Sequence, residues 1–111
     1  MDELDTKSKL TSEEFLMSML CKIGEARSLI MNAIALARQG EIKEAEALLK
    51  QSDDALAEAH KSQTSLIGFD EGEGKINMTL ILTHIQDHIM TTMLCRDLAN
   101  EFLFIYKKIA N

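Results

Sequence analysis

The stretch THIQDHIM, residues 83–90, holds the side chains with the clearest capacity for chemistry. His84 and His88 are four residues apart, with Asp87 between them, inside an otherwise apolar run. On a helix, residues four apart lie one turn apart on the same side, so the two imidazoles and the carboxylate share about a third of the circumference. Partial burial favours the neutral imidazole at pH 7. Three roles fit such a group: structural hydrogen bonding, metal binding and nucleophilic catalysis.

Metal binding requires more ligands than this stretch supplies. Two histidines at positions i and i+4 have a good zinc spacing. However, the chain has only one further histidine, His60, and its two cysteines, Cys21 and Cys95, show no paired spacing. The ligand set could be completed across a symmetry axis, where one Asp87 from each subunit would form a carboxylate ring suited to a hard cation.

Nucleophilic chemistry on phosphorus is the third role. A neutral imidazole can attack a phosphoryl group, hold it as a labile phosphoramidate and pass it on. Such a transfer has a loose transition state, so the protein mainly positions groups and supplies hydrogen-bond donors. A second histidine and a carboxamide near the reactive ring could act as these donors. From the residues alone, all three roles stay open.

The composition limits the class of protein. A chain of 111 residues with 46% apolar and 27% charged residues indicates one globular domain. The net charge of −6 argues against nucleic-acid binding, which needs a basic surface. Two widely spaced cysteines argue against a disulfide framework. Neither a membrane span nor a targeting segment is recognisable, so we expect a cytoplasmic protein.

The absence of proline and the periodicity of apolar residues predict an all-α fold. Helices are expected over about residues 12–39 and 42–67, with a loop at 68–75. A third helix is expected to follow Asn77 and to end near Lys108. Helices joined by short loops pack antiparallel, so we expect an elongated three-helix bundle over residues 11–111, preceded by a flexible tail at 1–10.

Helix ends are predicted from capping residues. Thr11 and Glu14 form a capping-box pattern for the first helix. Gly40 is a natural stop at its C-terminus. Asn77 is the predicted N-cap of the third helix.

The third helix carries two apolar stripes, whereas a helix at the edge of a lone three-helix bundle needs one. The first stripe, expected to face the core, consists of Ile81, Leu82, Ile85, Ile89 and Met93. The second apolar stripe consists of Leu80, Leu94, Leu98, Phe102, Ile105 and Ile109. A stripe turned away from the core predicts self-association around a symmetry axis. The alternative is a single broad stripe produced by curvature of the helix.

Three segments carry a resemblance to a known family. HIQDHIMTTML at 84–94 resembles the signature of the lactose/cellobiose-type IIA subunits of the bacterial sugar phosphotransferase system. GEARS at 24–28 and AEAHKSQTSLI at 57–67 resemble segments of that family's first and second helices. The first segment is specific, whereas GEARS alone would be weak. The resemblance extends over about residues 12–109.

The resemblance implies a homotrimer, a nine-helix bundle, that works as a phosphotransferase component. It implies that His84 is phosphorylated, that Gln86 and His88 line the phosphorylation site, and that Asp87 binds a divalent metal, expected to be Mg²⁺, with one ion per trimer. The implied partners are the phosphoryl donor HPr, an acceptor cysteine on a IIB subunit and, indirectly, the membrane IIC subunit during sugar uptake.

Two other functions compete with this one. A non-enzymatic, metal-stabilised helical scaffold would take up no phosphate. A histidine phosphotransfer domain of two-component signalling usually has Lys-Gly three and four residues after its histidine, where this chain has Asp87 and His88.

Three further residues have open roles. His60 is expected to pack or to hydrogen-bond to the site. Gly24, inside a helix, is expected to allow close helix approach or to leave room for a phosphoryl group. Arg27 is expected either to contact phosphate or to form a surface salt bridge.

Overall fold

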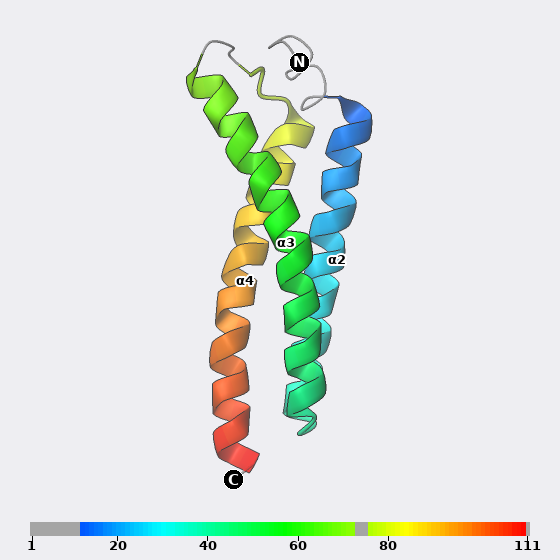
Figure 1. The fold of residues 1–111 in the computed structure, drawn as a ribbon, viewed down its shortest axis with the longest axis vertical. Helices are drawn as coiled ribbons and strands as arrows, with labels where there is room; N and C mark the ends of the chain where they lie inside the picture. The colour runs from blue at the N-terminus through cyan, green and yellow to red at the C-terminus, as the bar shows by residue number, and fades with distance from the viewer. Residues whose placement is uncertain (1–11, 73–75, 111) are drawn as a thin grey trace.

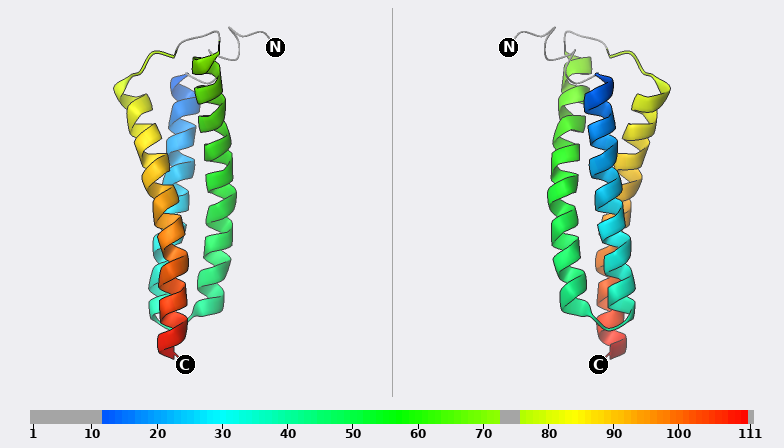
Figure 2. Two further views of the ribbon diagram at one scale, coloured as in Figure 1. Left: turned by 90° about the vertical axis from the view of Figure 1, so that its left-hand side faces the viewer. Right: turned by 90° about the vertical axis from the view of Figure 1, so that its right-hand side faces the viewer.

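The computed structural model describes residues 12–72 and 76–110. These residues form three α-helices: α2 (Glu13–Arg38), α3 (Ile42–Glu71) and α4 (Leu80–Ala110). Figure 1 shows an elongated bundle in which α2 and α4 run in the same direction and α3 runs against both. The two further views in Figure 2 show the helices lying alongside one another over most of their length. The predicted all-α, antiparallel three-helix fold is confirmed.

The core consists of two clusters of buried apolar residues along the bundle, and Met93 packs against both. Every helix contributes residues at helical spacing, as amphipathic helices do. The fully buried large side chains include Ile23 and Ile30 of α2 and Ile85 and Ile89 of α4. Small residues of α2 and α3, such as Ala33 and Ala45, are also fully buried.

The ends of α2 follow recognisable capping rules. Ser12 is the N-cap, and its hydroxyl accepts a 3.2 Å hydrogen bond from the Phe15 amide. The described N-cap therefore lies one residue beyond the predicted Thr11, which lies outside the described residues together with the predicted tail at 1–10. At the other end, Gly40 has φ +90°, a region that costs glycine no steric penalty. The Glu41 amide donates to the Leu36 carbonyl at 2.9 Å, which completes a Schellman motif and confirms the predicted stop.

The boundaries predicted for the second connection are wrong. α3 continues through Gly68 to Glu71, although a loop was expected from residue 68. Phe69 packs partly buried against the core, and this burial offsets the cost of a glycine in a helix, about 1 kcal/mol. α4 begins later than predicted, because Thr79 and not Asn77 accepts the 3.2 Å hydrogen bond from the Leu82 amide.

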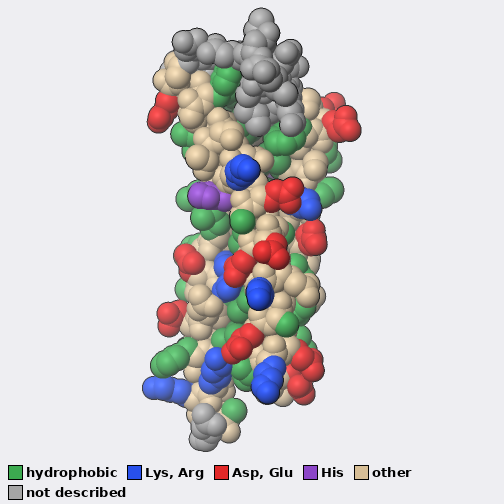
Figure 3. All heavy atoms as spheres, in the orientation of Figure 1, with side chains coloured by type: hydrophobic (Ala, Val, Ile, Leu, Met, Phe, Trp, Pro, Cys, Tyr) green, Lys and Arg blue, Asp and Glu red, His purple; other side chains and the backbone are tan. Residues whose placement is uncertain are grey.

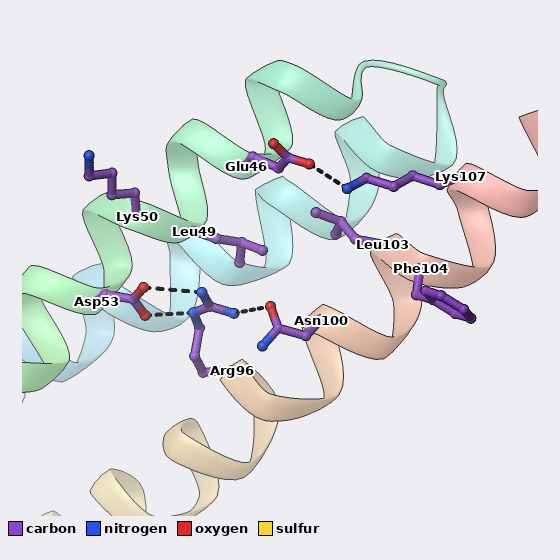
Figure 4. Close-up of a pocket in the computed structure, with 9 residues that line it drawn as sticks. All are labelled: Glu46, Leu49, Lys50, Asp53, Arg96, Asn100, Leu103, Phe104 and Lys107. Atoms are coloured by element: carbon purple, nitrogen blue, oxygen red, sulfur yellow. Dashed lines mark hydrogen bonds and ion pairs between the residues drawn. The ribbon is translucent and has the colours of Figure 1, made fainter.

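Ion pairs join α3 to α4 in the half of the bundle far from α4's start. Arg96 donates to both carboxylate oxygens of Asp53, at 2.6 and 3.1 Å, and also to Asn100 at 2.8 Å. Lys107 pairs with Glu46 at 2.6 Å. Figure 4 shows these pairs crossing a hollow of about 360 Å³ between the two helices. Within the described residues, four of its five charged lining residues are paired, Lys50 is not, and no histidine lines the hollow, so we assign it a structural role.

The second apolar stripe of α4 lies on the surface of the subunit. Its six residues have exposed fractions between 42% and 88%, whereas Leu82, Ile85 and Ile89 of the first stripe are buried. The prediction of two stripes, one buried and one exposed on the isolated subunit, is therefore confirmed. None of the helices in the described ranges is long and apolar enough to cross a membrane. Both cysteines are free, as the absence of a disulfide framework predicts.

Candidate functional site

His84 and His88 lie one turn apart near the start of α4 and stack on each other. Their ring centroids are 5.8 Å apart and the ring planes differ by 12°. His84 is exposed and His88 is half-buried. The helix backbone fixes this geometry, because side chains at i and i+4 meet on one face. An exposed imidazole thus stacks at a small angle on a half-buried one.

Burial lowers the pKa of His88 below the ordinary value of 6.5. The positive charge of Arg27 and the electrostatic effect of His84 lower this pKa further, while the carboxylate of Asp87 opposes them. Since the first three effects prevail, His88 is neutral at pH 7. A neutral imidazole keeps one N–H donor and one lone pair, so His88 can donate a hydrogen bond without bringing a second positive charge to the site.

Asp87 is exposed on the same side of α4. Within the described part of the chain its carboxylate makes no hydrogen bond or ion pair. Its backbone carbonyl accepts from the Thr91 hydroxyl at 3.1 Å, and the same hydroxyl lies 3.2 Å from the His88 carbonyl. Across residues 12–72 and 76–110, no three or more His, Cys, Asp or Glu side chains are grouped to hold a metal ion. One subunit therefore offers a metal a single unpaired carboxylate at this position.

Gln86 points away from the stacked histidines. Residues two apart on a helix do not face each other, and Gln86 turns toward α3, where it accepts a 2.8 Å hydrogen bond from Gln63. It also lines a mostly apolar hollow of about 260 Å³ with residues such as Leu66 and Met78. The structure therefore brings together His84, Asp87 and His88, and separates Gln86 from the other three predicted site residues.

Arg27 of α2 approaches the site from the neighbouring helix. It lines a hollow of about 220 Å³ with Met31 and with Thr91, Thr92 and Cys95 of α4. Thr92 was missed by the sequence analysis. The only available signal was its position, four residues after His88 on the same face; that its hydroxyl is buried without a partner depends on packing between helices.

His60 and Gly24, whose roles were open, now have defined surroundings. His60 is exposed and lines a hollow of about 190 Å³ with Met93, Arg96 and Asp97, on the side of α4 that faces α3. A Cβ placed on Gly24 would have no atom within 4 Å, so the glycine is not required for close helix packing inside the subunit. The expected role in providing room for a phosphoryl group stays a prediction.

The arrangement is suited to carrying a group on a histidine. A rigid helix presents an exposed nucleophilic ring, a neutral imidazole stacks against it, and an arginine lies nearby. The face over α3, shown in Figure 3, carries acidic and basic side chains along most of its length, with histidine beside hydrophobic side chains in its upper half. Fold and site together have the features of an all-α phosphocarrier.

Comparison with known proteins identifies the family. Residues 14–107 match the family described as "PTS system, Lactose/Cellobiose specific IIA subunit". The N,N'-diacetylchitobiose-specific EIIA component of Escherichia coli (strain K12) is 45% identical over 97 residues, which cover 87% of this chain and 84% of that protein. The chain therefore belongs to the lactose/cellobiose-specific IIA family of the sugar phosphotransferase system, whose members are phosphotransferase components that carry a phosphoryl group.

Solved structures agree with this assignment. The crystal structure of a cellobiose-specific enzyme IIA from Bacillus anthracis aligns with a TM-score of 0.82 and 36% identity, covering 90% of this chain and 92% of that one. The IIA subunit in the solution structures of an Escherichia coli IIA(chitobiose)–HPr complex aligns with a TM-score of 0.76 and 42% identity, covering 89% and 96% of the two chains.

Proposed function

We propose that His84 is the residue that carries the phosphoryl group. A ring nitrogen of His84 attacks phosphorus, so that a P–N bond forms on His84 while the P–N bond of the HPr phosphohistidine breaks. In the second transfer, a P–S bond forms on a cysteine of the IIB partner while the P–N bond of His84 breaks. The observation that carries this proposal is the stacked pair at 5.8 Å, in which His84 is the exposed member.

HPr is proposed as the donor because a relative with 42% identity has been solved in complex with HPr. The acceptor and the membrane IIC subunit are inferred from the role of IIA components in sugar uptake, which also implies a cytoplasmic location. Relatives are named for chitobiose, lichenan and lactose, so we expect the transported sugar to be an oligosaccharide of this class.

His88 supports the phosphoryl group through its N–H. A neutral imidazole stacked against the acceptor ring can donate to a phosphoryl oxygen without repelling an incoming cationic group. Gln86 faces α3 instead, where its Oε1 is already used by Gln63. We propose that its free N–H donors act at the His84 site of a neighbouring subunit.

Three subunits would cover the exposed second apolar stripe. Contiguous apolar surface on a small soluble protein is usually an interface. With the α4 helices around a threefold axis, residues such as Leu94, Leu98 and Ile105 would be buried against their own copies. The proposed assembly is the homotrimer expected from the family resemblance.

Asp87 fits a metal ligand in such a trimer. Its carboxylate is unpaired among the described residues, and it lies on the exposed side of α4 between Leu80 and Leu94 of the stripe. Three copies would provide carboxylate oxygens, the donors that Mg²⁺ and Ca²⁺ prefer. The ion would neutralise charge on the axis, and Asp87 is the only residue of this chain that we assign to it.

Phosphorylation in vitro tests the assignment. The purified protein is incubated with phosphoenolpyruvate, enzyme I and HPr, and the product is analysed by mass spectrometry. We expect one acid-labile phosphate per chain, located on His84 and lost in His84→Gln. His60→Gln is the matched control and should be labelled like the wild type. Labelling that persists in His84→Gln would refute the proposal, and so would a wild-type chain that takes up no phosphate.

A further inference from the structure

Arg27 is a cation without a carboxylate partner in the described part of the chain. Three other basic residues that face a neighbouring helix are paired: Lys22 with Glu58 at 3.4 Å, Arg96 with Asp53, and Lys107 with Glu46. The surface salt bridge that was one expected role of Arg27 is thus not found. Its guanidinium, with five N–H donors, remains available to an anion.

Along the bundle axis, Arg27 lies about one turn from His88 and about two turns from His84. α2 and α4 run in the same direction, and Met31 Sδ lies 4.0 Å from Cys95 Sγ. With an equal rise per residue in both helices, this contact places Gly24 about level with His88 and Arg27 about level with Thr91. The side chain of Arg27 is long enough to span the one turn back to His88.

The space around Arg27 is open. Arg27 itself is exposed, and it borders the hollow of about 220 Å³ between α2 and α4. One turn earlier on α2, a Cβ on Gly24 would have no atom within 4 Å. A group attached to the ring of His84 can therefore occupy this side of α4 without displacing a side chain at Gly24.

Thr92 of α4 also lines the same hollow. Thr92 is 2% exposed, and its Oγ1 is buried without a hydrogen-bond partner. Such groups are few in native proteins, and each costs about 1–3 kcal/mol if left unsatisfied. The hydroxyl of the neighbouring Thr91 donates to the backbone carbonyls of Asp87 and His88. The hollow thus places the cation Arg27 beside the face of α4 that carries His84 and His88.

We propose that Arg27 binds the phosphoryl oxygens of the phosphohistidine at His84. This inference rests on the proposed function of His84. When the P–N bond forms on His84, a dianionic group appears beside α2, and the Arg27 guanidinium donates charge-assisted hydrogen bonds to its oxygens. Arg27 forms no covalent bond and keeps its proton throughout. It lowers the free energy of the phosphorylated protein relative to the unphosphorylated one.

The equilibrium constant for phosphoryl exchange with HPr is the deciding measurement. This constant depends only on the free energies of the free and phosphorylated proteins, so a residue that merely docks HPr does not change it. We expect Arg27→Gln to shift the equilibrium toward phospho-HPr by about tenfold to a hundredfold, the range for a lost hydrogen bond to a charged group. Arg27→Lys should shift it less, because the charge is kept while the forked geometry is lost.

Arg38→Gln is the matched control, since Arg38 is an exposed arginine in the last turn of the same helix. It removes the same charge and should leave the constant unchanged. If wild type is labelled on His84 while Arg27→Gln exchanges like wild type, this inference fails and the proposed function stands. An equal shift of the equilibrium constant in Arg38→Gln would mean that the loss of net charge alone explains the effect, and it would also overturn this inference. If His84 of the wild-type protein is not labelled, both the proposed function and this inference are refuted.

Discussion

The Gln63 side chain donates a 2.8 Å hydrogen bond from Nε2 to Oε1 of Gln86, and so joins α3 to α4 within one turn of the stacked histidines. Gln63 is buried and Gln86 is half-buried, so neither carboxamide can readily exchange its partner for water. The bond fixes the rotation of α4 about its axis in this region. Because Gln86 is held toward α3, His84 and His88 are held on the other side, toward α2 and solvent.

A double-mutant cycle measures this contact. Gln63→Ala and Gln86→Ala should each lower the free energy of unfolding by about 1 kcal/mol or more, because each leaves a partly buried polar group unpaired. The double variant should lose less than the sum, with a coupling of at least about 0.5 kcal/mol. Urea denaturation gives these values, and Gln51→Ala, at an exposed position of α3, should be close to neutral. Additive effects would show that the hydrogen bond adds nothing to stability.

Leu98→Lys should dissociate the assembly without unfolding the subunit. Leu98 is exposed in the subunit, so a lysine there costs the isolated bundle little. In the trimer the same position would be buried, and burial of a leucine stabilises by about 1.5–3 kcal/mol, which the variant loses in every copy. Light scattering after size-exclusion chromatography should report a monomer with unchanged helical circular dichroism. Ile67, on α3, is about as exposed as Leu98, so Ile67→Lys should stay trimeric. A Leu98→Lys protein that is still trimeric would show that the second apolar stripe does not form the interface.

Gly24→Ala should separate stability from function. In the monomeric Leu98→Lys background it should raise the free energy of unfolding by about 0.5–1 kcal/mol, because a methyl group meets no atom and the unfolded chain loses freedom. In the trimer it should slow phosphorylation severalfold, since the methyl group takes up room beside the histidines. Gly68→Ala, another helical glycine with no atom near its Cβ, should stabilise without slowing transfer. Equal transfer rates in both variants would mean that Gly24 is only tolerated.

The pKa of His88 should respond in opposite directions to its two charged neighbours. Arg27→Gln removes a positive charge and should raise this pKa toward 6.5, whereas Asp87→Asn removes a negative charge and should lower it further. The direction of the pH dependence of stability follows from this lowered pKa. Between the pKa of His88 in the folded protein and 6.5, the unfolded chain binds more protons than the folded one, so the free energy of unfolding falls as the pH falls through this window. NMR titration of the imidazole signals measures the pKa, with Arg38→Gln as the control. An unchanged pKa in Arg27→Gln would place its guanidinium away from the ring.

The helices and their faces were predictable because periodicity is a local property of the sequence. The alternation that placed Ile85 and Ile89 in the core and Leu94 and Leu98 outside requires only the helical repeat. The histidine stack was predictable for the same reason, since its geometry lies within one helix. The Gln63–Gln86 bond was not, because it depends on how two helices are rotated against each other.

The helix boundaries and the contacts between helices could not be predicted without the tertiary structure. Gly68 reads locally as a stop, yet the packing of Phe69 against the core carries α3 beyond it. From the sequence, a phosphate contact and a surface salt bridge were equally expected for Arg27. Only the three-dimensional positions of the carboxylates show that Arg27 has no ion pair in the described ranges. The choice between Asn77, the predicted N-cap of α4, and Thr79, which accepts from the Leu82 amide, likewise depends on the tertiary structure.

The start of α4 offers a direct test of that choice. Thr79 accepts from the Leu82 amide at 3.2 Å, so Thr79→Ala leaves an amide of the first turn without its side-chain partner. We expect a loss of about 1 kcal/mol in the free energy of unfolding, the usual value of an N-cap threonine. Asn77→Ala, at the cap predicted from sequence, should change it by only a few tenths of that amount. Urea denaturation of both variants in the Leu98→Lys background avoids a contribution from subunit association. Because His84 lies little more than one turn beyond Thr79, fraying of this turn should also increase amide exchange at His84 in Thr79→Ala alone. A larger loss of unfolding free energy in Asn77→Ala than in Thr79→Ala would show that Asn77 is the N-cap of α4, as predicted from the sequence.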